Sequence, residues 1–148
     1  MRGYKFRGKI IDHRTRFLKT LGYKVDDWIY GENISVEHDD IEPEKIHVFI
    51  YGVEVNPDTV GQYIGLEDRD GSKVYEGDIV QDLDDAVLGV VYWDKDEAGF
   101  MFEFDTCLIQ GTYSYYYPVV GNKWDNPELL EQWKCQKENK IKWKDGKM

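Results

Sequence analysis

The stretch that decides the fold is GQYIGLEDRDGSKVYEGDIVQ, residues Gly61–Gln81. It crowds acidic side chains around Gly71, as a cation-binding loop does. It also alternates apolar and polar residues on both sides of that glycine, as a β-hairpin does. Asp70-Gly71 is a strong signal for a two-residue turn, because both central residues of a type I′ turn take positive φ and these residue types tolerate it. The stretch therefore predicts a β-hairpin, with Gly77-Asp78 leading into the next strand.

The spacing of glycine and glutamate in this stretch does not match that of an EF-hand calcium loop. An EF-hand loop carries glycine at its sixth position and a bidentate glutamate at its twelfth. With Gly71 at the sixth position, Gly77 falls at the twelfth, Glu76 is one residue short and Arg69 adds a cation among the ligands. We interpret the acidic residues as structural, and we expect the carboxylate of Asp78 to bond to nearby backbone amides.

The rest of the chain repeats short strand-like runs separated by turn signals. At 148 residues the chain can hold one complete core, with room for a small subdomain. Alternating aromatic and β-branched residues predict strands over residues 4–11, 28–36 with a break at Gly31, 47–55, 88–94, 98–109 and 112–121. The polar residues Glu37–Lys45 predict a loop, and Asn126 as N-cap with Pro127 at the first helical position predicts one C-terminal helix of about three turns. The fold class is thus mainly β (β-rich α+β).

The net charge of -10 is distributed unevenly. Residues 1–24 carry eight Lys/Arg and one acid, residues 134–148 carry six Lys and two acids, and residues 25–133 carry five basic and 26 acidic residues. An acidic body disfavours nonspecific binding of nucleic acid. The basic ends either fold back on this body, or meet the acidic body of a neighbouring subunit, or remain solvated tails.

The composition also indicates where the protein works. No apolar run approaches the roughly 20 residues of a membrane span, and the N-terminal residues lack the apolar stretch of a signal peptide. We therefore expect no membrane association and a cytoplasmic location. Cys107 and Cys135 form no disulfide framework or C-x-x-C pair, so we expect two free thiols, one in a strand and one on a helix.

Ordered blocks of the sequence resemble the YopX family of phage and prophage proteins. Besides GQYIGLEDRDGSKVYEGDIV, the blocks are KFRGK (Lys5–Lys9), WIYG (Trp28–Gly31), VNPDTVGQY (Val55–Tyr63), GVVYWD (Gly89–Asp94) and VVGNKWDNPELLE (Val119–Glu131). The tail beyond Trp133 is longer and more basic than the family pattern. We interpret these signature residues as structural: Gly65, Leu66, Asp68, Gly71, Tyr75, Glu76, Gly77, Asp78, Gly121, Asn122, Asn126 and Pro127.

The resemblance implies β-hairpins, a small SH3-like barrel and homo-oligomers. It provides no catalytic residue, because no activity is established for the family. We expect an N-terminal β region over residues 1–60, a barrel region with the C-terminal helix over residues 61–133, and a basic tail over residues 134–148.

A divalent-metal site is one hypothesis for the acidic loop. His38, Asp39 and Asp40, with His13 or His47 nearby in space, could bind a metal that supports phosphodiester hydrolysis. Scattered histidines without helical spacing favour solvated loop residues instead, and Asp82, Asp84 and Asp85 have the same interpretation. No histidine is placed locally to activate either cysteine, and no phosphate-binding or dinucleotide motif occurs. We therefore predict no cofactor.

Four tyrosines near residue 115 predict an interface. On the expected strand, Tyr113, Tyr115 and Tyr117 face one side and Tyr116 faces the other. Tyrosines therefore project on both sides of the strand. Tyrosine is enriched at protein interfaces, whereas base stacking would need basic neighbours that this region lacks. An interface or a core position is therefore favoured over nucleic-acid binding.

The sequence favours a phage- or prophage-encoded, non-enzymatic, oligomeric protein-binding module in the cytoplasm of a bacterial host cell. Its expected partners are other copies of the chain and a host or phage protein. Two alternatives stay open. One is an acidic mimic of nucleic acid that inhibits another protein, and the other is a metal-dependent hydrolase.

Overall fold

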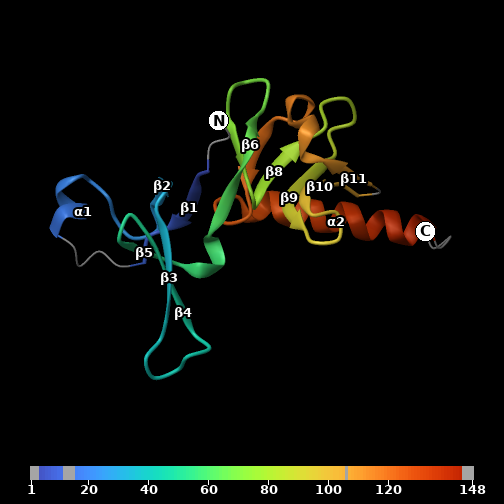
Figure 1. Ribbon diagram of the computed structural model, residues 1–148. Helices are drawn as coiled ribbons and strands as arrows, with labels where there is room; N and C mark the ends of the chain where they lie inside the picture. The colour runs from blue at the N-terminus through green and yellow to red at the C-terminus, as the bar shows by residue number, and fades with distance from the viewer. Residues whose placement is uncertain (1–3, 12–15, 106, 145–148) are drawn as a thin grey trace. The chain divides into compact units, whose positions relative to one another are not determined.

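Strand β6 (Gly61–Glu67) contains the boundary between two units of the chain. In the computed structural model, unit 1 comprises Met1–Tyr63 and unit 2 comprises Ile64–Met148. The structure describes residues 4–11, 16–105 and 107–144, and it describes no side chains at 16, 17 and 140–144. The predicted mainly β fold is confirmed: the described chain forms three antiparallel sheets, and both units contain more strand than helix (Figure 1).

Unit 1 is built from short strands around one apolar cluster. Its elements are β1 (Phe6–Lys9), α1 (Arg16–Thr20), β2 (Trp28–Gly31), β3 (Ile34–His38), β4 (Ile46–Ile50), β5 (Val53–Val55), η1 (Pro57–Thr59) and the start of β6. Strand β1 pairs with β2 and β6, while β3, β4 and β5 form a separate antiparallel sheet in that order. As expected, Asn56 caps η1 by accepting a hydrogen bond from the amide of Asp58.

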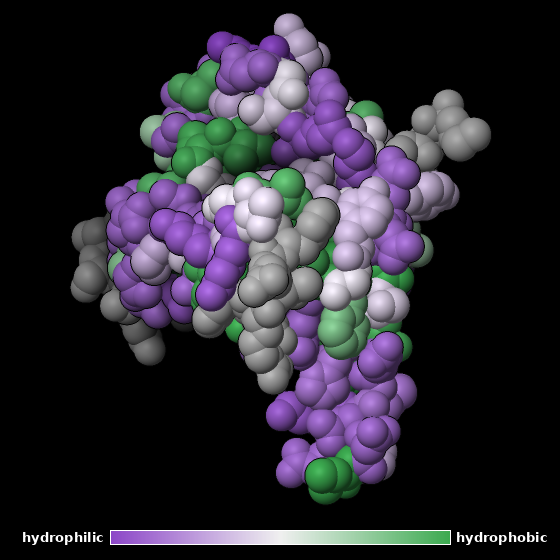
Figure 2. Space-filling view, turned by 90° about the vertical axis from the view of Figure 1, so that its left-hand side faces the viewer, coloured by the Kyte–Doolittle hydropathy of each residue, from purple (hydrophilic) through white to green (hydrophobic). Residues whose placement is uncertain are grey.

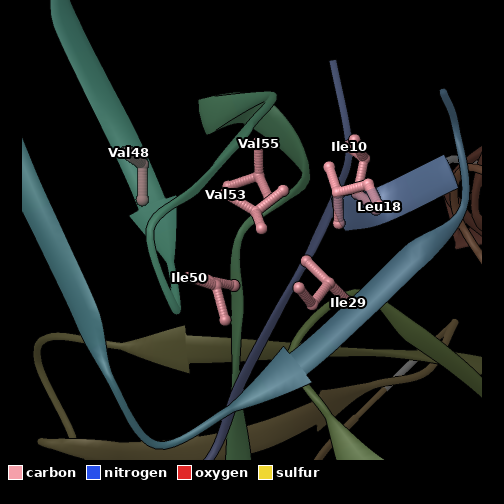
Figure 3. Packing of buried hydrophobic residues seen from close by; sticks show 7 residues of the cluster. All are labelled: Ile10, Leu18, Ile29, Val48, Ile50, Val53 and Val55. Atoms are coloured by element: carbon pink, nitrogen blue, oxygen red, sulfur yellow. The ribbon is translucent and has the colours of Figure 1, made fainter. Parts of the chain in front are cut away.

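The core of unit 1 joins these elements. Figure 3 shows its seven buried side chains pointing toward one another: Ile10, Leu18, Ile29, Val48, Ile50, Val53 and Val55. Val48 lies directly opposite Val55, and Ile50 lies opposite Val53, so alternate residues of β4 and β5 face the core together.

Unit 2 contains an open five-stranded antiparallel sheet. Its elements are β7 (Lys73–Tyr75), β8 (Asp78–Gln81), β9 (Leu88–Asp94), β10 (Gly99–Glu103), β11 (Leu108–Gln110), η2 (Gly111–Tyr116), β12 (Val119–Asn122) and α2 (Pro127–Lys144). The strand order is β11-β10-β9-β8-β12, and no pairing between described residues joins β11 to β12. The expected SH3-like barrel is therefore not closed.

The sheet of unit 2 is apolar on both faces. Ile79, Leu88 and Val90 lie against Leu129, Leu130 and Trp133 of α2. Their neighbours along the strands, Val80 and Val91, belong to a second cluster with Ile64, Val74, Phe102 and Phe104. Because successive strand residues point to opposite faces, α2 covers one face, while residues from β6 and β7 pack on the other. Helix α2 is longer than the three turns expected and runs through Lys144.

The opening stretch forms the predicted hairpin with a different turn. The amide of Gly71 donates to the carbonyl of Asp68, and the amide of Asp68 donates to the carbonyl of Ser72. Gly71 has φ +81°, whereas Asp70 does not have positive φ. The loop therefore has three residues, 69–71, of the kind that places glycine in the left-handed region at its end, and the predicted two-residue turn is wrong.

Candidate functional site

The tyrosine-rich segment forms a turn, so the strand predicted across it is wrong. Residues Gly111–Tyr116 form the 3-10 helix η2, and strand β12 begins only at Val119. Three tyrosines of this turn are exposed: Tyr113 by 52%, Tyr115 by 61% and Tyr116 by 64%. The rings of Tyr115 and Tyr116 meet edge-to-face at 5.5 Å. We call Tyr113, Tyr115 and Tyr116 the tyrosine turn.

The tyrosine turn is fixed to the sheet by buried polar groups. Ser114 is buried, and its Oγ donates a hydrogen bond to the carbonyl of Glu67 at 3.0 Å. Next to it, the buried carboxylate of Asp68 accepts from the amide of Val119 through Oδ2 at 2.9 Å. Oδ1 of the same carboxylate accepts from the amides of Asp70 and Ser72, at 2.9 Å each. One carboxylate thus holds the β6–β7 loop beside the segment that follows the tyrosine turn.

A shallow groove of about 250 Å³ adjoins the tyrosine turn. It is lined by Arg69, Asp82, Leu83, Asp84, Tyr116 and Tyr117. The groove therefore combines two aromatic rings and an exposed leucine with two carboxylates and one guanidinium. Such a lining suits a protein side chain that is apolar along its length and charged or polar at its end.

Tyr117 differs from the other three tyrosines, because its ring belongs largely to the core. It packs against Phe102 at 5.9 Å and against Phe104 at 5.0 Å between ring centroids. Burial, followed by the negative charge of Asp82, raises the pKa of the Tyr117 hydroxyl above its ordinary value. Tyr117 therefore forms the floor of the groove rather than its exposed rim.

Residues of the family signature hold the turns around this sheet. As expected, Asp78 is structural: it is buried, and its Oδ2 accepts from the amide of Tyr75 at 2.8 Å. Gly77 has φ +87°, and a Cβ added there would collide with the ring of Trp124. Five other signature residues lie in the segment from β6 to β8. Gly65 and Gly71 have positive φ, Leu66 is partly exposed, Tyr75 is buried, and Glu76 lies in the turn between β7 and β8.

The later signature residues form the entry to α2. Asn122 Oδ1 accepts from the amides of Trp124 and Asp125, at 3.0 Å and 2.9 Å. Asn126 Oδ1 accepts from the amide of Asn122 at 3.1 Å, and it lies where a Cβ on Gly121 would be. Pro127 is the first residue of α2, as predicted. The side chain of Asn126 thus ties the helix start back to β12.

A separate polar cluster in unit 1 contains Asp39, His47 and Glu54. Nε2 of His47 lies 2.9 Å from Asp39 Oδ2, and Nδ1 lies 2.8 Å from Glu54 Oε2. His38 points elsewhere, with Nδ1 2.8 Å from the carbonyl of Pro43, and His13 lies outside the described residues. Glu54 was not identified from the sequence, because only the pairing of β4 with β5 brings it beside His47.

Hydrogen bonds determine the electrostatics of this cluster. The pKa of His47 is raised, first by Asp39 and then by Glu54. The pKa of Asp39 is held well below its usual range, first by the amide of Glu42 and then by His47 and the amide of Ile41. Among the described residues, no group of three or more His, Cys, Asp or Glu side chains is arranged to hold a metal ion. The cluster is therefore interpreted as a histidine bound between two carboxylates.

The remaining candidates lie on the surface. Asp82 Oδ1 accepts from the amide of Asp84 in the β8–β9 loop. Asp84 and Asp85 are exposed there, as expected of a solvated loop, whereas Asp82 is half-buried and lines the groove with Asp84. Both cysteines are free and exposed. Cys135 lies on α2 as predicted, whereas Cys107 precedes β11 instead of lying within a strand.

No helix of the described chain is sufficiently long and apolar to span a membrane.

Comparison with known proteins identifies the family. A crystal structure of protein EF1440 from Enterococcus faecalis is similar to this chain with a TM-score of 0.51 and 21% sequence identity, over 88% of this chain and 99% of that chain. That similarity concerns the fold alone. No curated protein matches the chain significantly. The model of the family described as YopX protein matches residues 5–131, from β1 into α2, and the chain therefore belongs to the YopX family.

Proposed function

We propose that this chain is a phage- or prophage-encoded, non-enzymatic, oligomeric protein-binding module that acts in the cytoplasm of a bacterial host cell. Membership in the YopX family supports the proposed origin. The observation that best supports a binding role is the exposure of three tyrosines in the tyrosine turn, beside the groove lined by Arg69, Asp82 and Asp84. We propose that a host or phage protein docks there.

Physical chemistry favours such a surface for protein binding. Tyrosine offers a large amphipathic contact area at a low cost in side-chain entropy. The turn is anchored through Ser114, and Asp68 holds the neighbouring segment, so little backbone ordering remains to oppose binding. The carboxylates of Asp82 and Asp84 line the groove with Tyr116, which favours a partner that inserts a lysine or arginine side chain.

A tagged pull-down from infected or induced host lysate tests this function. The bait proteins are the unmodified chain, the double variant Tyr115→Ala/Tyr116→Ala, and Tyr4→Ala as a matched control, because Tyr4 is also exposed but lies in unit 1. Each pull-down is performed with and without nuclease and followed by mass spectrometry. We expect one nuclease-resistant partner that the double variant loses and the Tyr4 variant retains.

The other outcomes contradict the proposal in different ways. If all three baits capture the partner equally, the tyrosine turn is not part of the binding surface. Recovery of the bait alone would argue against a stable partner. A one-to-one complex that dissolves with rising salt and survives the tyrosine substitutions would instead indicate charge mimicry of nucleic acid.

A further inference from the structure

The β3–β4 hairpin carries apolar side chains beyond the core of unit 1. Val36 lies opposite Val48, and Ile46 lies opposite His38, so all four side chains share the sheet face that buries Val48. Toward the end of the hairpin this face becomes exposed: Val36 is 56% exposed and Ile46 39%. Ile41, in the connecting loop, is 89% exposed. We call Val36, Ile41 and Ile46 the hairpin stripe.

Acidic side chains surround the hairpin stripe. Residues 34–50 contain five acids and a single basic residue, Lys45. Four of these acids are exposed: Glu37, Asp40, Glu42 and Glu44. The hairpin extends away from the other elements of unit 1 (Figure 1), and Figure 2 shows a hydrophobic spot at the end of the lowest arm, with hydrophilic residues above it. This surface suits a ligand that combines apolar side chains with several positive charges.

The same chain contains a segment of that chemistry. Residues 134–148 carry six lysines and two acids, together with Ile141 and Trp143. The first part of this segment continues α2, which is attached to its own sheet through Leu129, Leu130 and Trp133. We call residues 134–148 the lysine segment. Its positive charge complements the hairpin, whereas two acidic hairpins would repel each other.

We propose that the β3–β4 hairpin of one copy binds the lysine segment of a second copy, with the hairpin stripe as the apolar contact and the surrounding carboxylates as partners of the lysines. This inference rests on the proposed function, in which the chain self-associates, and it identifies the two surfaces that contact each other. Because the two surfaces differ, the contact is head-to-tail, and repetition of it produces a closed ring or an open chain of copies.

Charge reversal in the full-length chain tests this contact by sedimentation velocity. The hairpin variant is Glu42→Lys/Glu44→Lys, and the segment variant is Lys140→Glu/Lys142→Glu. The control Asp96→Lys/Glu97→Lys makes the same change of charge in the exposed β9–β10 turn. We expect each reversal in the contact to weaken self-association roughly tenfold or more, the control to retain it, and the variant that combines both reversals to recover it.

The experiment separates this inference from self-association in general. If the unmodified chain sediments as a monomer at every concentration, self-association itself is refuted. If it forms an oligomer that neither reversal weakens, the chain self-associates through other surfaces and the hairpin contact is wrong. If both reversals act but their combination recovers nothing, the hairpin and the lysine segment do not bind each other. The variant Ile41→Ser tests the apolar part, and unchanged association there would refute the role of the hairpin stripe.

Discussion

The side-chain amide of Gln136 and the backbone of Leu88 form two reciprocal hydrogen bonds. Gln136 Oε1 accepts from the amide of Leu88, and Gln136 Nε2 donates to the carbonyl of Leu88, each at 2.9 Å. Leu88 is the first residue of β9, where pairing with β8 begins. The glutamine of α2 thus bonds to this end of the strand as a neighbouring peptide would.

Replacing Gln136 with glutamate should destabilise unit 2. A carboxylate retains the acceptor for the Leu88 amide but loses the donor, and it places a negative charge against the Leu88 carbonyl. We expect the free energy of unfolding to fall by about 1 to 3 kcal/mol, measured by urea denaturation. Gln132→Glu is the control, because Gln132 is an exposed glutamine on the same helix. Equal losses for the two variants would mean that the Leu88 contacts contribute nothing measurable.

Removing the carboxylate of Asp68 should both destabilise the chain and loosen the segment that follows the tyrosine turn. Asp68→Ala leaves the amides of Asp70, Ser72 and Val119 without their acceptor. We expect a loss of about 2 to 4 kcal/mol in unfolding free energy, because hydrogen bonds to a charged group contribute more than neutral ones. Hydrogen exchange should also quicken at the amide of Val119. Asp70→Ala, an exposed carboxylate in the same loop, should change neither quantity, and a fully protected Val119 amide in Asp68→Ala would contradict the assignment.

A methyl group at Gly77 should be costly for two independent reasons. Alanine strains the backbone at φ +87°, and its Cβ collides with the ring of Trp124. We expect Gly77→Ala to lower the unfolding free energy by about 2 to 4 kcal/mol. Gly99→Ala is the matched control, because a Cβ there meets only the Glu97 carbonyl at 3.8 Å. Thermal unfolding of both variants compares them, and a smaller loss at Gly77 than at Gly99 would refute the packing argument.

The hairpin of the opening stretch could be predicted from the sequence, but its turn type could not. Asp-Gly fits both a two-residue turn and a three-residue loop that ends in left-handed glycine. The carboxylate of Asp68 favours the latter, since it accepts from the amides of Asp70 and Ser72 within the loop. That carboxylate also reaches the amide of Val119, 51 residues away, a contact that local pattern cannot show.

The candidate surface was predicted by residue type but not by conformation. Aromatic residues favour strands, so a strand was expected across Tyr113–Tyr117. A buried Ser114, bonded to Glu67 47 residues away, stabilises a 3-10 turn instead. This tertiary contact exposes Tyr115 and Tyr116 together, and it leaves Tyr117 to pack on Phe102. Glu54 was missed for a similar reason, because strand register places it beside His47.

The stability of unit 1 should depend on pH through His47. Both ring nitrogens face carboxylates, Asp39 and Glu54, and Glu37 lies opposite His47 on the same sheet face. A protonated imidazole donates from both nitrogens, whereas the neutral ring donates from one. Because folding raises the pKa of His47, its contribution to stability is complete below the ordinary value of 6.5 and is lost as the pH rises through the raised value.

The carboxylate of Asp39 limits this window on the acid side. Because folding lowers its pKa, its contribution is present above the ordinary value of 3.8 and is lost as the pH falls through the lowered value. The cluster should therefore stabilise unit 1 most between pH 3.8 and pH 6.5, where Asp39 is ionised and His47 is protonated. Glu54→Gln should lower the pKa of His47, measured by NMR titration of the imidazole protons, with the resonance identified by its absence in His47→Gln.

The matched control for this titration is Glu42→Gln, because Glu42 is an exposed carboxylate in the β3–β4 loop, and its backbone amide rather than its side chain bonds to Asp39. Like Glu54→Gln, it removes one negative charge, but it leaves the side chains of Asp39 and Glu54 that bond to His47 unchanged. We expect a clearly smaller fall in the His47 pKa than Glu54→Gln causes, because an exposed charge is screened by solvent. Equal shifts in the two variants would mean that the general negative charge of the hairpin, rather than the hydrogen bond to Glu54, controls the protonation of His47.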